Sequence, residues 1–151
     1  MKSSILNFRP LVAVVLMAMM CFMPLADAQK TYRDATGGFL NETTFLASAA
    51  RTSSGDSTAV VDLGAYANGN IFIDVTAASG TPSMTVAFQS CPDTTVANCF
   101  DHTTSSAITG TGKTLLKVNN FGRYVLIKYT ISGGTPSLTF SVKGAFKAVG
   151  N

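Results

Sequence analysis

The sequence contains no tryptophan, one histidine, one glutamate and few charged residues of any kind. Lysine, arginine, aspartate and glutamate make up 13% of its 151 residues, and the formal net charge is +3. Proteins that bind nucleic acid usually carry a strongly basic surface, so this near-neutral balance argues against nucleic acid as a partner. Because tryptophan offers the largest flat apolar side chain, a glycan-binding surface here would have to use tyrosine or phenylalanine.

The residue types that catalyse reactions or bind metals are scarce and scattered. The single histidine, His102, follows Asp101. Adjacent side chains on a strand point to opposite faces, so Asp101 cannot be the carboxylate that orients this histidine in a hydrolytic triad. A glycosidase pair is not expected because Glu42 is the only glutamate. Asp56, Asp93 and Asp101 do not form a continuous calcium loop. We therefore predict no enzyme activity, no metal and no cofactor.

The first 28 residues have the pattern of a secretory signal peptide. Two basic residues precede an apolar run, Leu11–Leu25, and small residues occupy the expected cleavage positions before Gln29. The alternative is a single membrane anchor, but the apolar run is shorter than the roughly 20 residues that a spanning helix needs. We predict export to the periplasm, the cell surface or the extracellular space, with no membrane span in the mature chain.

Two cysteines remain after removal of the signal, Cys91 and Cys99, and they bracket a short loop. An exported chain folds in an oxidising compartment, so a disulfide between them is the first expectation. Closing this loop would stabilise the folded chain by about 2–3 kcal/mol on the chain-entropy estimate. A zinc site is less favoured, because two thiols and His102 do not supply four ligands.

The sequence contains an internal repeat, in which a unit of about thirty residues occurs twice. Residues 73–88, IDVTAASGTPSMTVAF, align with residues 127–142, IKYTISGGTPSLTFSV, and are identical at seven of sixteen positions. The similarity extends upstream after the alignment is shifted by one residue, which gives repeat units 57–88 and 112–142.

Within both units apolar and polar residues alternate with the period of two that is typical of β-strands. No part of the mature chain shows sustained helical spacing. The sequence Gly-Thr-Pro-Ser, at 80–83 and 134–137, is predicted to connect strands, because proline fixes φ and cannot donate to a β-ladder. The predicted core consists of Val61, Leu63, Ile71, Ile73, Val75, Ala77, Met84, Val86, Phe88, Leu116, Val118, Val125, Ile127, Tyr129, Ile131, Leu138, Phe140 and Val142.

These patterns predict an all-β fold, an antiparallel two-sheet sandwich of the jelly-roll or immunoglobulin-like kind, with eight or nine strands and pseudo-twofold duplication. Each unit offers one apolar face, and two such faces packed together complete a core. Residues 29–56 are expected to form an arm or edge strand, and 57–151 the sandwich. Segment 29–50 has no counterpart in the second half and is a candidate for strand exchange with a neighbouring copy.

Apolar residues at equivalent positions of the two units break the alternation and are expected to point outward. They are Val60, Phe72, Leu115 and Leu126. Exposed apolar groups that gather in a patch mark interfaces, which favours a homo-oligomer, a filament or a particle. The alternative is that residues 39–50, or a strand near Phe100, cover them within one chain.

Charges on the outward face are complementary between the two units: Asp62 aligns with Lys117, and Asp74 with Lys128. No acidic residue follows Asp101, so an acidic first half precedes a basic second half. This asymmetry favours head-to-tail contacts between copies. Alternatively these charges form cross-strand pairs within one sheet.

Four aromatic residues, Tyr32, Tyr66, Phe121 and Tyr124, remain free to contact a ligand. They are candidates to face a ligand, and a surface glycan is the alternative partner. The simpler interpretation is that Tyr66 and Phe121, which are equivalent in the two units, close the ends of the core.

The segments VDLGAY (61–66), IDVTAASGTPSMTVAFQS (73–90) and NFGRYVLIKYTISGGTPSLTFSVKG (120–144) resemble small β-sandwich structural proteins of tailed-phage virions. The resemblance covers roughly 57–147. It implies a non-enzymatic role in many copies in a particle or tube, and it brings no catalytic residues. The export signal is a departure from that family.

Overall fold

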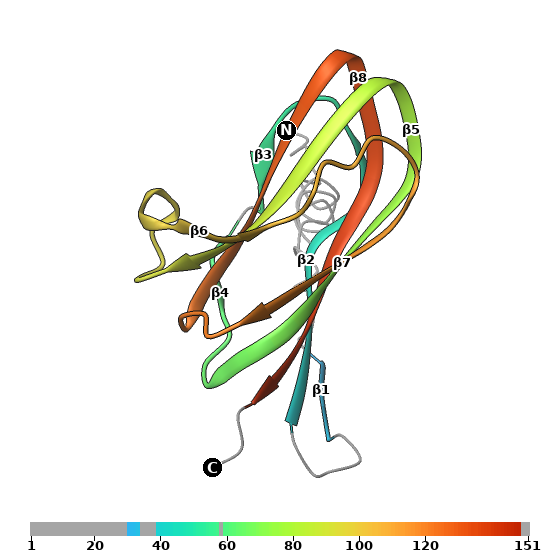
Figure 1. Cartoon of the computed structure of the whole chain (residues 1–151). Helices are drawn as coiled ribbons and strands as arrows, with labels where there is room; N and C mark the ends of the chain where they lie inside the picture. The colour runs from blue at the N-terminus through green and yellow to red at the C-terminus, as the bar shows by residue number, and fades with distance from the viewer. Residues whose placement is uncertain (1–29, 34–38, 58, 149–151) are drawn as a thin grey trace, which may run out of the picture.

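The computed structural model describes residues 30–33, 39–57 and 59–148, and these form an all-β fold (Figure 1). The strands are β1 (Lys30–Arg33), β2 (Phe39–Arg51), β3 (Gly55–Asp56), β4 (Val61–Asp62), β5 (Tyr66–Cys91), β6 (Phe100–Thr104), β7 (Gly112–Asn119) and β8 (Tyr124–Ala148), with one 3-10 turn at Val96–Asn98. Every pairing is antiparallel, and the strands belong to one hydrogen-bonded sheet in the order β1-β2-β8-β5-β6.

The centre of the sheet is a long two-stranded ribbon. Strands β5 and β8, of 26 and 25 residues, pair along their whole length, from Tyr66 opposite Ala148 to Cys91 opposite Tyr124. Shorter strands add to both sides. Strand β7 pairs with the first half of β5 and β6 with its second half, while β3 and β4 pair with the first half of β8 and β2 with its second half.

The two Gly-Thr-Pro-Ser segments run through the ribbon, so the prediction that they connect strands is wrong. The ladder register shifts here, and Gly80 (φ +73°), Gly133 (φ +122°) and Thr135 (φ +46°) have left-handed backbone conformations. A Cβ atom on Gly80 would collide with the carbonyl oxygen of Thr135. These irregularities bend both strands where the ladder is locally interrupted, and Pro82 is accommodated there.

The ribbon curves back on itself, as Figure 1 shows, and its buried apolar side chains belong to a single core cluster. Phe146 on β8 pairs with Gly69 on β5, and a straight strand would hold Gly69 about 60 Å from Phe88. The rings of Phe146 and Phe88 nevertheless lie 6.2 Å apart between centroids. Both halves of the ribbon therefore turn their apolar faces to the same interior.

The predicted core is largely confirmed. All its members are buried except Val61 and Leu116, which are half-buried against the cluster, and Ala77, which is exposed. A register shift between Val75 and Ala77 breaks the alternation and turns Ala77 outward. The core also contains residues that the prediction missed, namely Phe45, Leu46, Phe121 and Phe146.

Strand β2 is a structural part of the sheet, since it pairs with β8 from Leu40 to Arg51 and buries Phe45 and Leu46. Consecutive buried residues are explained by the register shift between Thr44 and Leu46. Residues 107–109 contribute a single bridge to the sheet, between Ile108 and Met84. The predicted signal peptide lies outside the described residues. Within the described part of the chain, no helix is long and apolar enough to span a membrane.

Candidate functional site

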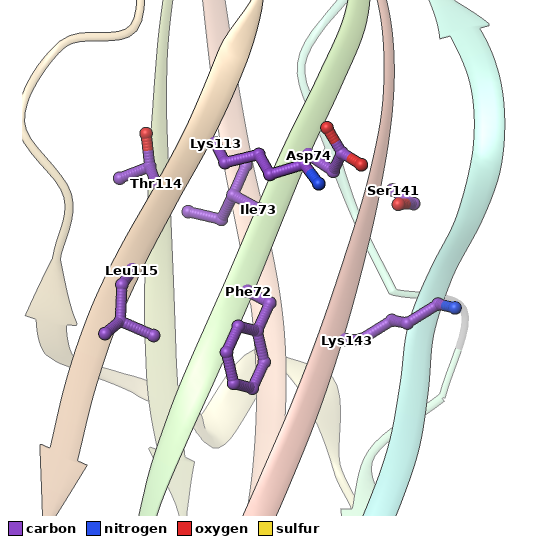
Figure 2. A pocket seen from close by; sticks show the side chains of 8 residues that line it. All are labelled: Phe72, Ile73, Asp74, Lys113, Thr114, Leu115, Ser141 and Lys143. Atoms are coloured by element: carbon purple, nitrogen blue, oxygen red, sulfur yellow. The ribbon is translucent and has the colours of Figure 1, made fainter.

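The candidate site is the outward face of strands β5 and β7. Phe72 and Leu115 are register partners on this face and expose 47% and 51% of their surfaces, whereas Ile71 and Ile73 point into the core. The alternation of the strand therefore forces Phe72 into solvent. Figure 2 shows the two apolar side chains next to each other on adjacent strands.

Charged side chains flank this apolar pair in an open pocket. Lys113 on β7 pairs in register with Asp74 on β5, one row along from Leu115 and Phe72. Figure 2 shows the Lys113 side chain extended toward Asp74, while the Lys143 side chain on β8 extends away from Phe72. The pocket is lined by Phe72, Ile73, Asp74, Lys113, Thr114, Leu115, Ser141 and Lys143.

The expectation that Leu126 belongs to an exposed apolar surface is wrong. Leu126 is 1% exposed, and its register partner Gln89 is buried as well, so this face of the ribbon is covered at that end. Val60 is half-buried. The two units thus differ: Phe72 is open to a partner, whereas Leu126, at the equivalent position, is not.

The alternative interpretation, in which Asp62 pairs with Lys117 and Asp74 with Lys128 across strands of one sheet, differs from the observed pairing. Lys117 pairs in register with Asn70, and Lys128 with Asp56. Asp62 forms an ion pair with Arg123, whose Nη2 and Nε atoms lie 2.6 and 2.8 Å from the carboxylate oxygens.

Asp62 has a structural role in joining the turn after β4 to the start of β8. Its Oδ1 atom also accepts a hydrogen bond from the Gly64 backbone N–H at 2.8 Å. The bonds from Arg123 and then from Gly64 lower the pKa of Asp62 below its usual value. Arg123 in turn lies over the Tyr124 ring, 5.1 Å from its centroid. Asp62 is therefore engaged within its own chain.

Phe121 is not a ligand-facing aromatic. It is 8% exposed, and its ring lies 5.1 Å from that of Phe88 and 5.6 Å from that of Phe146, between centroids. Its position agrees with the simpler interpretation that it closes the core. Tyr66 and Tyr124 are half-buried, and Tyr66 packs against the core cluster.

The predicted disulfide is present, with an S–S distance of 1.98 Å between Cys91 and Cys99. It closes a loop that is also held by Asp93. The Asp93 carboxylate accepts hydrogen bonds from the Thr95 backbone N–H at 2.7 Å and from Asn98 Nδ2 at 2.9 Å. Led by the Asn98 bond, these contacts lower the pKa of Asp93. The loop therefore uses Asp93 to satisfy its own donors.

Asp101 and His102 engage different partners. Asp101 accepts a hydrogen bond from Gln89 Nε2 at 2.6 Å, and His102 Nε2 lies 2.8 Å from the carbonyl oxygen of Asn119. Across residues 30–33, 39–57 and 59–148, no group of three or more His, Cys, Asp or Glu side chains is arranged to hold a metal ion.

A second open pocket, which the sequence analysis missed, lies further along β5, β7 and β8. Its polar side chains are Asn68, Asn70, Lys117, Asn119 and Lys147. They come from three strands that are far apart in the sequence. The available signal was the alternation on each strand, which groups them on one face only once the pairing of β7 and β8 with β5 is known.

No protein-family model matches this chain, and no curated protein matches it. Among solved structures, the SPBc2 prophage-derived protein YomS is similar, with 16% sequence identity and a TM-score of 0.42. The similarity covers 72% of this chain and 93% of YomS. A chain in the structure of infectious bursal disease virus Gx strain is similar over 83% of this chain and 33% of its own length, with 15% identity and a TM-score of 0.39. Both are distant similarities between β-rich structures.

Proposed function

We propose that this protein is an exported, non-enzymatic structural subunit that assembles with copies of itself at a surface or in a particle. The observation that carries the proposal is the adjacent pair Phe72 and Leu115, each about half exposed on a regular sheet face. Single exposed apolar residues are common, but contiguous ones on a flat face are typical of interfaces. A role in a phage-like virion is the narrower form of this proposal, and it rests on the sequence resemblance in 57–147.

The architecture that we propose for the subunit is a two-layer sandwich built from a duplicated unit. The pairing register supports it: Ile73 pairs with Val142, and Ile127 pairs with Phe88. Residues 73 and 88 of the first unit align with residues 127 and 142 of the second, so exchanging the two units converts the first pair into the second. The 6.2 Å approach of Phe88 and Phe146 supports two facing layers, because it brings distant parts of one ribbon together.

Export is supported by the disulfide between Cys91 and Cys99, since such bonds persist in oxidising compartments. The covalent link joins the end of β5 to the segment before β6.

A second candidate function is binding of a polar surface ligand such as a glycan. The pocket that contains Asn68, Asn70, Lys117 and Asn119 favours it, because amide and ammonium groups on one face match hydroxyl and carboxylate groups. A glycan array probed with wild type and with Asn70→Ala would test this candidate. Equal glycan binding by the two proteins would argue against the pocket as the binding site.

Light scattering coupled to size exclusion tests the main proposal. The secreted chain is expected to show a mass that rises with concentration above that of one copy. A mass equal to one copy at every concentration up to the solubility limit would overturn it.

A further inference from the structure

We infer that two copies of this chain pack face to face through β5 and β7, about a twofold axis parallel to these strands and midway between them. This inference rests on the proposed self-assembly and names its contact. A row here means a register pair of β5 and β7. The axis places each residue of β7 over the partner's β5 residue from the same row.

The first consequence is apolar contact at the centre. Leu115 and Phe72 occupy one row, so Leu115 packs on the partner's Phe72 and Phe72 on the partner's Leu115. Each side chain has about half of its surface available for this contact. Removing this apolar surface from water drives association.

The second consequence is charge complementarity. Lys113 and Asp74 occupy the next row, so Lys113 lies over the partner's Asp74 and Asp74 lies over the partner's Lys113. One surface patch therefore matches itself in apolar character and charge, as an isologous contact requires. Lys143 lies on β8, beyond β5, so it remains at the rim in water.

Two other arrangements that join the two apolar pairs bring like charges together. A twofold axis in the same plane but perpendicular to the strands, centred on the row of Leu115, places Lys113 over the partner's Lys117. Antiparallel pairing of the β7 edges centred on Leu115 also places these two lysines opposite each other. Like charges directly opposite destabilise pairing, and lysines on an edge strand oppose edge-to-edge association. Of these three arrangements, electrostatics thus favours the face-to-face contact about the axis parallel to the strands.

Charge reversal tests this geometry in the full secreted chain, with sedimentation velocity as the readout and circular dichroism to verify folding. Asp74→Lys makes the row wholly positive, and Lys113→Glu makes it wholly negative. We expect each variant alone to dimerise at least tenfold more weakly than wild type. An equimolar mixture of the two variants is expected to recover association, because the two surfaces are then complementary.

Lys143→Glu is the matched control, since it reverses a charge that lines the same pocket but lies off the proposed axis. It is expected to change the dimer dissociation constant less than threefold. If wild type associates but the mixture gains nothing over the single variants, the face-to-face contact is refuted and self-assembly stands. If wild type is a monomer throughout, the proposed function itself fails.

Discussion

Replacing Phe146 with alanine should destabilise the fold more than almost any other single truncation. The Phe146 side chain is 0% exposed, and its ring lies 6.0 Å from that of Phe45, 6.2 Å from that of Phe88 and 5.6 Å from that of Phe121, between centroids. Gly69 lies against the ring, because a Cβ atom there would collide with it. The site therefore has little freedom to collapse around a smaller side chain.

Removing a buried phenylalanine typically costs about 3–5 kcal/mol in the free energy of unfolding. Aromatic pairs add about 0.5–1.5 kcal/mol each beyond the area that they bury. We therefore expect Phe146→Ala to lower the free energy of unfolding by about 4 kcal/mol or more, measured by urea denaturation of the secreted chain. Phe100→Ala is the matched control, and because Phe100 is 71% exposed, its cost should stay below about 1 kcal/mol. A loss below about 1.5 kcal/mol for Phe146→Ala would refute the reasoning that the ribbon folds over this ring.

Three further predictions concern stability. The pKa of Asp62 is lowered in the folded chain by Arg123, so this carboxylate stabilises the fold above its ordinary pKa, and that contribution is lost as pH falls through the lowered pKa. Asp62→Asn should remove this part of the acid dependence of the urea midpoint, and an unchanged profile would contradict the linkage. Cys99→Ser should lower the free energy of unfolding by about 2–3 kcal/mol, whereas no difference from wild type under oxidising conditions would show that the bond is dispensable. Gly80→Ala should cost about 1–3 kcal/mol because of the positive φ and the collision at the bend, against little change for Gly110→Ala, which has open space around it. Equal melting temperatures for these two glycine variants would argue against a constrained bend.

The sequence was sufficient to predict the all-β class and most of the core. Alternation with a period of two is a local property, so Ile71, Ile73 and Val75 could be assigned to one face without knowledge of their partners. The prediction that Ala77 lies in the core was wrong because the register shift between Val75 and Ala77 is a property of the pairing with β8, which the sequence of β5 alone does not reveal.

The Gly-Thr-Pro-Ser segments show what local sequence cannot predict, namely whether the chain bends or reverses at these positions. Glycine and proline mark a departure from regular strand geometry, but a bend and a reversal of the chain carry the same composition. The long pairing of β5 with β8, which decides between these outcomes, depends on residues far apart in the sequence.

The candidate site was predicted in part. Alternation correctly placed Phe72 and Leu115 outward, but it cannot say whether an outward face is covered, and Leu126 is. Likewise, the partner of Asp62 is Arg123, which lies in the other half of the chain, so no spacing rule identifies it.

The central claim is that Phe72 and Leu115 mediate contact between copies. Sedimentation equilibrium of the secreted chain with Phe72→Ser and Leu115→Ser combined, compared with wild type at matched concentrations, tests it most directly. Our account predicts that wild type associates with rising concentration and that the double variant stays a folded monomer. Association that is equal in both proteins would contradict it.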